Sequence, residues 1–149
     1  LDIYTDVIVR GPGADILTID GGDSETVFSI HGGSPYAALE VKIEGLSITG
    51  STRDGIVTTG ASLALSHVNI HSNGDPVGTP SGYGRGIVAY GGSVLIENSA
   101  VHGHDQTGIA TYSDLQMINT TVSGNGGAGI DAAVGPQQIE LVGSTVANN

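Results

Sequence analysis

Two successive stretches decide the fold: GIVAYGGSVLIENSAVHGH at residues 86–104 and GIATYSDLQMINTTVSGN at residues 108–125. Each opens on Gly-Ile, continues into an alternating apolar run, and reaches another apolar residue a few positions later. Alternation with a period of two places the apolar side chains on one face of a β-strand. The two stretches are therefore versions of one unit that contains three short strands.

The same unit recurs along most of the chain. Five apolar pairs have an offset of two residues, and a further apolar residue lies seven positions after the first member of each. The pairs are Val41/Ile43, Leu63/Leu65, Val94/Ile96, Leu115/Met117 and Ile139/Leu141, and the later residues are Ile48, Ile70, Val101, Val122 and Val146. Four units are preceded by Gly-Ile, at Gly55-Ile56, Gly86-Ile87, Gly108-Ile109 and Gly129-Ile130. Such repetition, with Gly, Asn, Ser and Asp between the strands, predicts a solenoid.

We therefore predict an all-β fold, a right-handed parallel β-helix of about six coils with three short strands per coil. Parallel crossovers are right-handed almost without exception, which sets the hand. Residues 1–149 are expected to form a single domain, with an irregular first coil at 1–38, regular coils at 39–149 and an inserted loop at 74–84. The strands expected in the first coil lie at 6–11, 16–21 and 27–32.

A polar column accompanies the apolar ones. Ten residues after the first member of each apolar pair stand Ser51, Asn73, His104, Asn125 and Asn149. Stacked Asn side chains hydrogen-bond along the axis, and Asn tolerates the left-handed backbone of tight turns. We expect Asn73, Asn125 and Asn149 to form a partial ladder.

Composition excludes several classes of function. The chain has 149 residues, 25 of them Gly, no Cys and a formal net charge of −11. This charge disfavours nucleic acid and anionic membranes, because both attract Lys and Arg, and no apolar run is long enough to span a bilayer. Without Cys, disulfides and thiolate metal sites are excluded. Because the sequence begins at Leu1 rather than Met, we expect a piece of a longer protein.

Several stretches carry a resemblance. They are RGPGADILTIDG at 10–21, VFSI at 27–30, GLSITG at 45–50, TVSGN at 121–125 and STVANN at 144–149. These resemble the repeats of large bacterial extracellular proteins with right-handed parallel β-helices, often surface or adhesin-like proteins. The resemblance implies a non-catalytic structural or adhesive module, extracellular or at the cell surface. It also implies open ends, whose unpaired strand edges favour further coils or other copies as partners.

Two tyrosines suggest a ligand face. Tyr90 and Tyr112 each follow the Ile of a Gly-Ile pair by three residues, so alternation points both rings outward on consecutive coils. Exposed aromatic rings on a polar solenoid are a reasonable mark of carbohydrate contact. We expect Tyr90, Tyr112 and Asp131 to bind a sugar, with Thr59 in a flanking row and a polysaccharide as the partner.

The alternative function is a polysaccharide lyase or uronate epimerase-like enzyme acting on acidic polysaccharide, since parallel β-helices also carry these activities. Such chemistry needs a base for the C5 proton and a cation beside the carboxylate. Asp54 and Arg85 each precede a Gly-Ile pair and should meet on adjacent coils, with Asp105 close by in the next coil. Tyr83, Tyr90 and His104 are expected beside this cluster. An ion pair without catalysis fits the same spacing. No pair of acids is singled out for glycoside hydrolysis.

We expect no catalytic residue and no resident metal or other cofactor. His71 and His102 should stack outward about 5 Å apart on consecutive coils, but a catalytic zinc usually takes three protein ligands. The turn that contains Asp20, Asp23 and Glu25 offers carboxylates suited to Ca²⁺, although such turns are mostly solvated.

Overall fold

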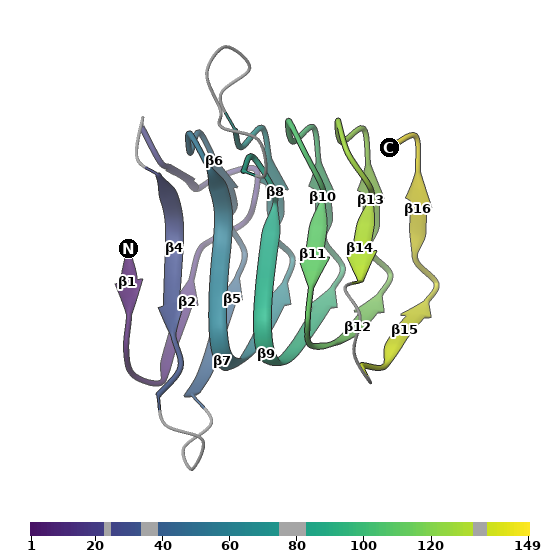
Figure 1. Cartoon of the computed structure of the whole chain (residues 1–149). Coiled ribbons are helices and arrows are strands. Elements are labelled where there is room, and N and C mark those ends of the chain that lie inside the picture. The colour runs from purple at the N-terminus through teal and green to yellow at the C-terminus, as the bar shows by residue number, and fades with distance from the viewer. Residues whose placement is uncertain (23–24, 34–38, 75–82, 133–136) are drawn as a thin grey trace.

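The structure is a computed structural model in which residues 1–22, 25–33, 39–74, 83–132 and 137–149 are described. Within these ranges the chain forms sixteen strands and no helix. The strands are β1 (Asp2–Ile3), β2 (Val7–Arg10), β3 (Thr18–Asp20), β4 (Thr26–His31), β5 (Leu39–Glu44), β6 (Ser47–Thr49), β7 (Asp54–Ser66), β8 (Asn69–His71), β9 (Ile87–Glu97), β10 (Ala100–His102), β11 (Ile109–Thr111), β12 (Asp114–Ile118), β13 (Thr121–Ser123), β14 (Ile130–Ala132), β15 (Ile139–Val142) and β16 (Thr145–Ala147). Figure 1 shows them stacked from β1 at one end to β16 at the other, with the two termini at opposite ends.

The strands form the three faces of a parallel β-helix. The first face runs β1-β4-β7-β9-β11-β14, and the third face is a six-stranded parallel sheet in the order β3-β6-β8-β10-β13-β16. The second face contains β2, β5, β12 and β15 together with the later halves of β7 and β9. Each coil contributes one strand to the third face, so the described residues contain six coils. The predicted all-β parallel solenoid is confirmed.

The third and fourth coils differ from the expected three short strands. There the first and second faces are joined by one continuous strand, β7 or β9, which bends at Gly60 or Gly91. These glycines have φ of 65° and 75°, a left-handed conformation that costs Gly little. The register skips them, because Thr59 pairs with Tyr90 and the next pair is Ala61 with Gly92.

The beginning of the chain departs from the expected first coil. β2 and β3 belong to that coil, but its first strand is β1, which lies before the expected segments. The segment expected as the third strand, at 27–32, forms β4 and opens the second coil, where Phe28 pairs with Ile56. Phe28 thus occupies the position that Ile takes in Gly-Ile, and Val27 stands in the place of Gly, so no Gly-Ile pair marks this coil.

The predicted apolar columns are present and form the core. Leu63 pairs with Val41 and Val94, and Leu115 pairs with Val94 and Ile139, which places these residues in single file. All are buried except Ile139 in the last coil. Each buried Leu, Ile or Val contributes about 1.5–3 kcal/mol through removal of apolar surface from water, so stacked aliphatic side chains stabilise the chain with few aromatic residues.

The polar column closes the turn after the third face. Each ladder side chain accepts a hydrogen bond from a backbone N–H one coil earlier: Asn73 Oδ1 from Ser51 at 3.1 Å and Asn125 Oδ1 from His104 at 3.1 Å. His104 is a full member, because its Nδ1 accepts from the N–H of Asn73 at 3.2 Å. The ladder also explains the Gly of Gly-Ile, since a Cβ at Gly86 would lie 2.6 Å from His104 Nε2.

Candidate functional site

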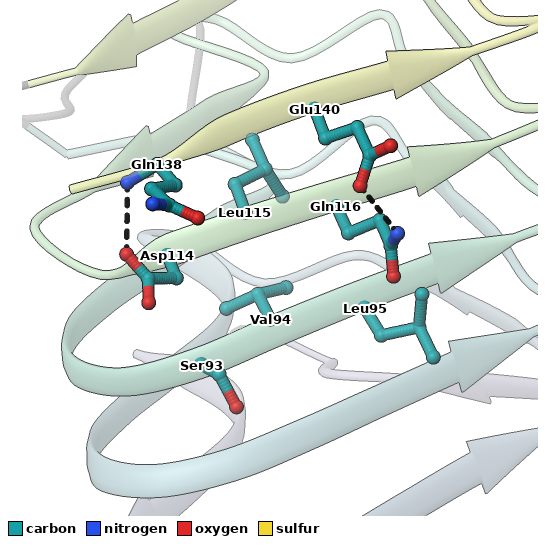
Figure 2. Close-up of a pocket in the computed structure, with 8 residues that line it drawn as sticks. All are labelled: Ser93, Val94, Leu95, Asp114, Leu115, Gln116, Gln138 and Glu140. Carbon is teal, nitrogen blue, oxygen red and sulfur yellow. Dashed lines mark hydrogen bonds between the residues drawn. The ribbon is translucent and has the colours of Figure 1, made fainter.

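Two hollows of similar volume, about 300 and 320 Å³, lie on the described surface. The smaller one lies over β9, β12 and β15, as Figure 2 shows. Its polar groups bind one another: Gln116 Nε2 donates to Glu140 at 2.6 Å and the Gln138 N–H donates to Asp114 at 2.8 Å. None of the candidate catalytic or ligand-binding residues lines this hollow. It therefore provides a control surface for comparison with the second hollow.

The larger hollow lies on the first face, where β4, β7 and β9 are adjacent (Figure 1). We call it the arginine pocket. The residues that give it its chemistry are His31, Arg53, Asp54, Tyr83, Arg85 and Tyr90, and Thr59 also lines it. Arg53, Tyr83 and Arg85 come from the segments that precede β7 and β9, so the pocket combines regular coils with irregular connections.

Asp54 and Arg85 meet on adjacent coils, as their spacing predicts. Arg85 Nε donates to Oδ1 of Asp54 and Nη2 donates to Oδ2, both at 3.0 Å, and the Arg85 N–H adds a third bond at 3.0 Å. The Asp54 side chain is 3% exposed. Partial burial opposes the charged guanidinium, but the hydrogen bonds and charge of Asp54 outweigh it, so the pKa of Arg85 lies above its ordinary value. Arg85 therefore stays protonated and is unsuited to act as a base.

Arg53 and Tyr83 form the outer wall of the pocket. Arg53 Cζ lies 3.6 Å from the centre of the Tyr83 ring, and Arg85 Cζ lies 5.8 Å from it. Arg53 Nη1 also donates to Glu25 at 2.9 Å. Glu25 is largely exposed, so this ion pair is open to solvent, unlike the pair of Arg85 with Asp54. Sequence reasoning did not single out Arg53, because the equivalent turn positions of later coils hold Gln106 and Gly127 and no basic residue repeats there.

His104 and Asp105 do not lie where the enzyme alternative requires them. His104 is 2% exposed and packs in the ladder, and Asp105 lies in the following turn beside Gly74 and Gly84. Neither lines the arginine pocket. The cause is Gly103, whose φ of 66° interrupts the alternation that would have kept His104 on the outward side with His102. Of the four residues proposed for catalysis, the structure brings together only Asp54 and Arg85.

An outward row of rings borders the pocket. Tyr90 and Tyr112 are stacked with ring centres 5.1 Å apart, as predicted, and are 43% and 53% exposed. In the same row Tyr4 stacks on His31 at 4.7 Å, and Thr59 pairs with His31 and Tyr90. Thr59 therefore belongs to the row of the tyrosines and not to the expected flanking row, because it lies three residues after Ile56 just as Tyr90 lies three after Ile87. We call Tyr4, His31, Thr59, Tyr90 and Tyr112 the ring row. Sequence reasoning missed its first two members, because no Gly-Ile pair marks the first two coils.

Asp131 lies in the neighbouring outward row. It pairs with Ala110, two residues before Tyr112, and is exposed. This is the flanking position on the same face that alternation predicts for it. The position of Asp131 follows from the strand register alone.

A family model for the right-handed β-helix region matches residues 7–149. The chain belongs to the right-handed β-helix family. The match covers nearly the whole chain and agrees with the predicted hand of the coil. No curated protein and no solved structure matches the chain. Membership establishes the fold of this β-helix, and its activity has to be argued from the surface.

The predicted histidine pair of this β-helix is present on the third face. His71 and His102 stack with ring centres 5.4 Å apart and an angle of 12° between the rings. Partial burial lowers the pKa of His71, and the charge of His102 acts in the same direction. Among the described residues no group of three or more His, Asp or Glu is placed to hold a metal ion.

The acidic turn of this β-helix engages its carboxylates within the protein. Asp20 Oδ1 accepts from the N–H of Gly22 at 2.9 Å, and Glu25 pairs with Arg53. Asp23 lies outside the described residues, as do residues 75–82 of the inserted loop. In the described part of the chain, no helix is long and apolar enough to cross a membrane.

Proposed function

We propose that this β-helix is a non-catalytic module of an extracellular or cell-surface protein, and that it binds carbohydrate along the ring row. One observation carries the proposal: Tyr90 and Tyr112 remain about half exposed while stacked in register on consecutive coils. Aromatic side chains on a soluble surface expose apolar area that a ligand can cover. The apolar C–H groups of a sugar supply that cover along the exposed ring edges, and its hydroxyl groups reach the polar rows on either side, including Asp131.

The polar groups of the pocket favour binding of a sugar over its chemical conversion. Arg85 is held by Asp54 in two parallel hydrogen bonds and stays protonated, and His104 packs in the ladder rather than in the pocket. A lyase would need a base beside the bound sugar, and with Arg85 and His104 set aside that role would fall to His31 or a tyrosine of the pocket. Incubation with alginate and pectate tests this part directly, because lyase products absorb in the ultraviolet. Product that disappears in Arg85→Ala would overturn the non-catalytic proposal in favour of the enzyme.

A glycan array tests the binding proposal. We expect the protein to bind a subset of glycans, with the signal reduced by Tyr112→Ala and by Tyr90→Ala. Gln116→Ala in the hollow of Figure 2 is the matched control, since it alters a polar surface of similar size on another face. Retention of all glycan signals in both tyrosine variants would contradict the proposal.

The proposed partners are further coils or other copies of the chain, packed on the ends of the stack. The last coil exposes the apolar residues of its second and third faces, Ile139, Leu141 and Val146, while Ile130 on the first face is partly buried. Their counterparts in the preceding coil, Leu115, Met117 and Val122, are buried. Another coil on this layer would bury the exposed side chains and pair the open strand edges.

A further inference from the structure

The ring row is interrupted at one position. Thr59 pairs with His31 on one side and Tyr90 on the other, so a small side chain stands between two ring-bearing positions. Neighbouring rings elsewhere in the row are 4.7 and 5.1 Å apart. His31 and Tyr90 are two strand spacings apart, roughly 9.6 Å. A gap about as thick as one ring is therefore open over Thr59. His31, Thr59 and Tyr90 all line the arginine pocket.

Because the other rings of the row are stacked on one another, this gap is the place where a ligand can reach ring faces. One face of Tyr90 lies against Tyr112, and one face of His31 lies against Tyr4. The register directs the other face of each ring toward Thr59. A flat ligand therefore finds two aromatic faces here, whereas along the stacked pairs it meets mainly ring edges.

We infer that the gap over Thr59 is a slot for one terminal acidic sugar, a pyranose ring that carries a carboxylate. This inference rests on the proposed carbohydrate function and specifies its ligand. A ring placed midway lies about 4.8 Å from each neighbour, the spacing that the row itself uses. Because His31 and Tyr90 close the slot along the axis, a sugar enters from outside as the end of a glycan. A volume of about 320 Å³ is at the small end of ligand pockets and suits a single sugar unit.

Arg53 provides the charge that selects an acidic sugar. Its guanidinium is positioned on Tyr83 and already binds one carboxylate, that of the exposed Glu25. An exposed ion pair contributes about 0–1 kcal/mol, so a ligand carboxylate displaces Glu25 at little cost. Arg85 keeps Asp54 and is not needed for this exchange. The net charge of −11 repels a long polyanion, which favours a single acidic unit.

Titration of simple glycosides tests the slot. Methyl glucuronoside, methyl glucoside and methyl sialoside are added to the isotope-labelled protein, and dissociation constants are taken from NMR shift changes. We expect an acidic glycoside to bind about tenfold more tightly than the glucoside, equivalent to about 1.4 kcal/mol, and the two acidic probes distinguish a uronic from a sialic type of sugar. Arg53→Gln should abolish the advantage of the acidic sugar.

Substitution of Thr59 separates the slot from the ring row as a whole. Thr59→Tyr completes the row with the protein's own ring and should weaken binding at least about tenfold, whereas Thr59→Ala keeps the slot open and should retain binding. Acidic-sugar binding that survives Thr59→Tyr but is lost in Tyr112→Ala overturns the slot and leaves the proposed function standing. No binding of any glycoside also overturns the slot, and the glycan array then judges the proposed function. If Thr59→Tyr unfolds, judged by circular dichroism, an unchanged preference in Arg53→Gln overturns the inference.

Discussion

Acidification should weaken this fold through one buried imidazole, that of His104. Burial lowers its pKa to about 4, and the charges of His102 and His71 act in the same direction. Protonation of Nδ1 would also remove the acceptor for the Asn73 N–H. The backbone of Ile70 beside the ring opposes the lowering of the pKa but does not cancel it. In the unfolded chain the same group titrates near pH 6.5.

The magnitude follows from the difference between the two pKa values. Above pH 6.5 His104 is neutral in both states, so its part of the stability is fully present. As the pH falls toward 4 the unfolded chain takes up a proton that the folded chain does not, and the free energy of unfolding decreases. Below pH 4 both states are protonated, and this group causes no further loss. A depression from 6.5 to about 4 corresponds to about 3 kcal/mol.

The matched control is His104→Asn, because Asn fills the same ladder position in adjacent coils and does not titrate. Urea unfolding followed by circular dichroism at several pH values between 7.5 and 4 gives the free energy for both proteins. We expect the wild type to lose about 3 kcal/mol more than His104→Asn over this interval. Parallel pH profiles would refute the reasoning. An NMR titration that places the pKa of His104 above 6 in the wild type would refute it independently.

Three further predictions concern the scaffold. Gly108→Ala should destabilise the fold by about 1–3 kcal/mol, because its Cβ would lie 2.8 Å from Asn125 Nδ2, whereas Gly33→Ala has open space and should change little in the same urea assay. Leu65→Ala should lower the free energy of unfolding by about 2–5 kcal/mol in a thermal or urea assay, because Leu65 is only 1% exposed. Leu141→Ala should lower it by well under half as much, because Leu141 is 46% exposed. Sedimentation velocity should show concentration-dependent association that Leu141→Lys reduces, and a strict monomer at high concentration would contradict end-to-end packing of copies.

The core and the outward rows could be predicted from the sequence because every coil solves the same packing problem. The offsets of two and seven residues place Leu63 above Val41 and below Val94, and simple alternation is enough to put Tyr90 beside Tyr112. Alternation ceases to be a guide where the backbone enters the left-handed region. At Gly103 it does so, and the next side chain turns inward instead of outward.

The arginine pocket could not be predicted in full, because two of its six chemically important side chains, Arg53 and Tyr83, lie in the connections before β7 and β9. Arg53 occupies a turn position that Gln106 and Gly127 fill in later coils, so no basic residue repeats there. Tyr83 follows the inserted loop, whose path the repeat does not fix. Only the folded chain brings their side chains to 3.6 Å from one another. The pair of Asp54 and Arg85 was accessible to sequence reasoning for the opposite reason, since both precede Gly-Ile in consecutive coils.

In a solenoid each row repeats the same kind of side chain in the same packing arrangement. A residue that differs from the rest of its row therefore marks a position where this regular packing is absent. Thr59 forgoes aromatic contacts with two neighbouring rings, worth about 0.5–1.5 kcal/mol each. His104 replaces an amide in the ladder with a group that destabilises the fold in acid. Thr59 lines the arginine pocket beside residues that the connection between the third and fourth coils supplies, whereas His104 lies after the fourth coil and outside the pocket. The inward columns of the third and fourth coils remain fully buried, so on their outward side the chain can exchange some stability at Thr59 for a recessed, charged surface.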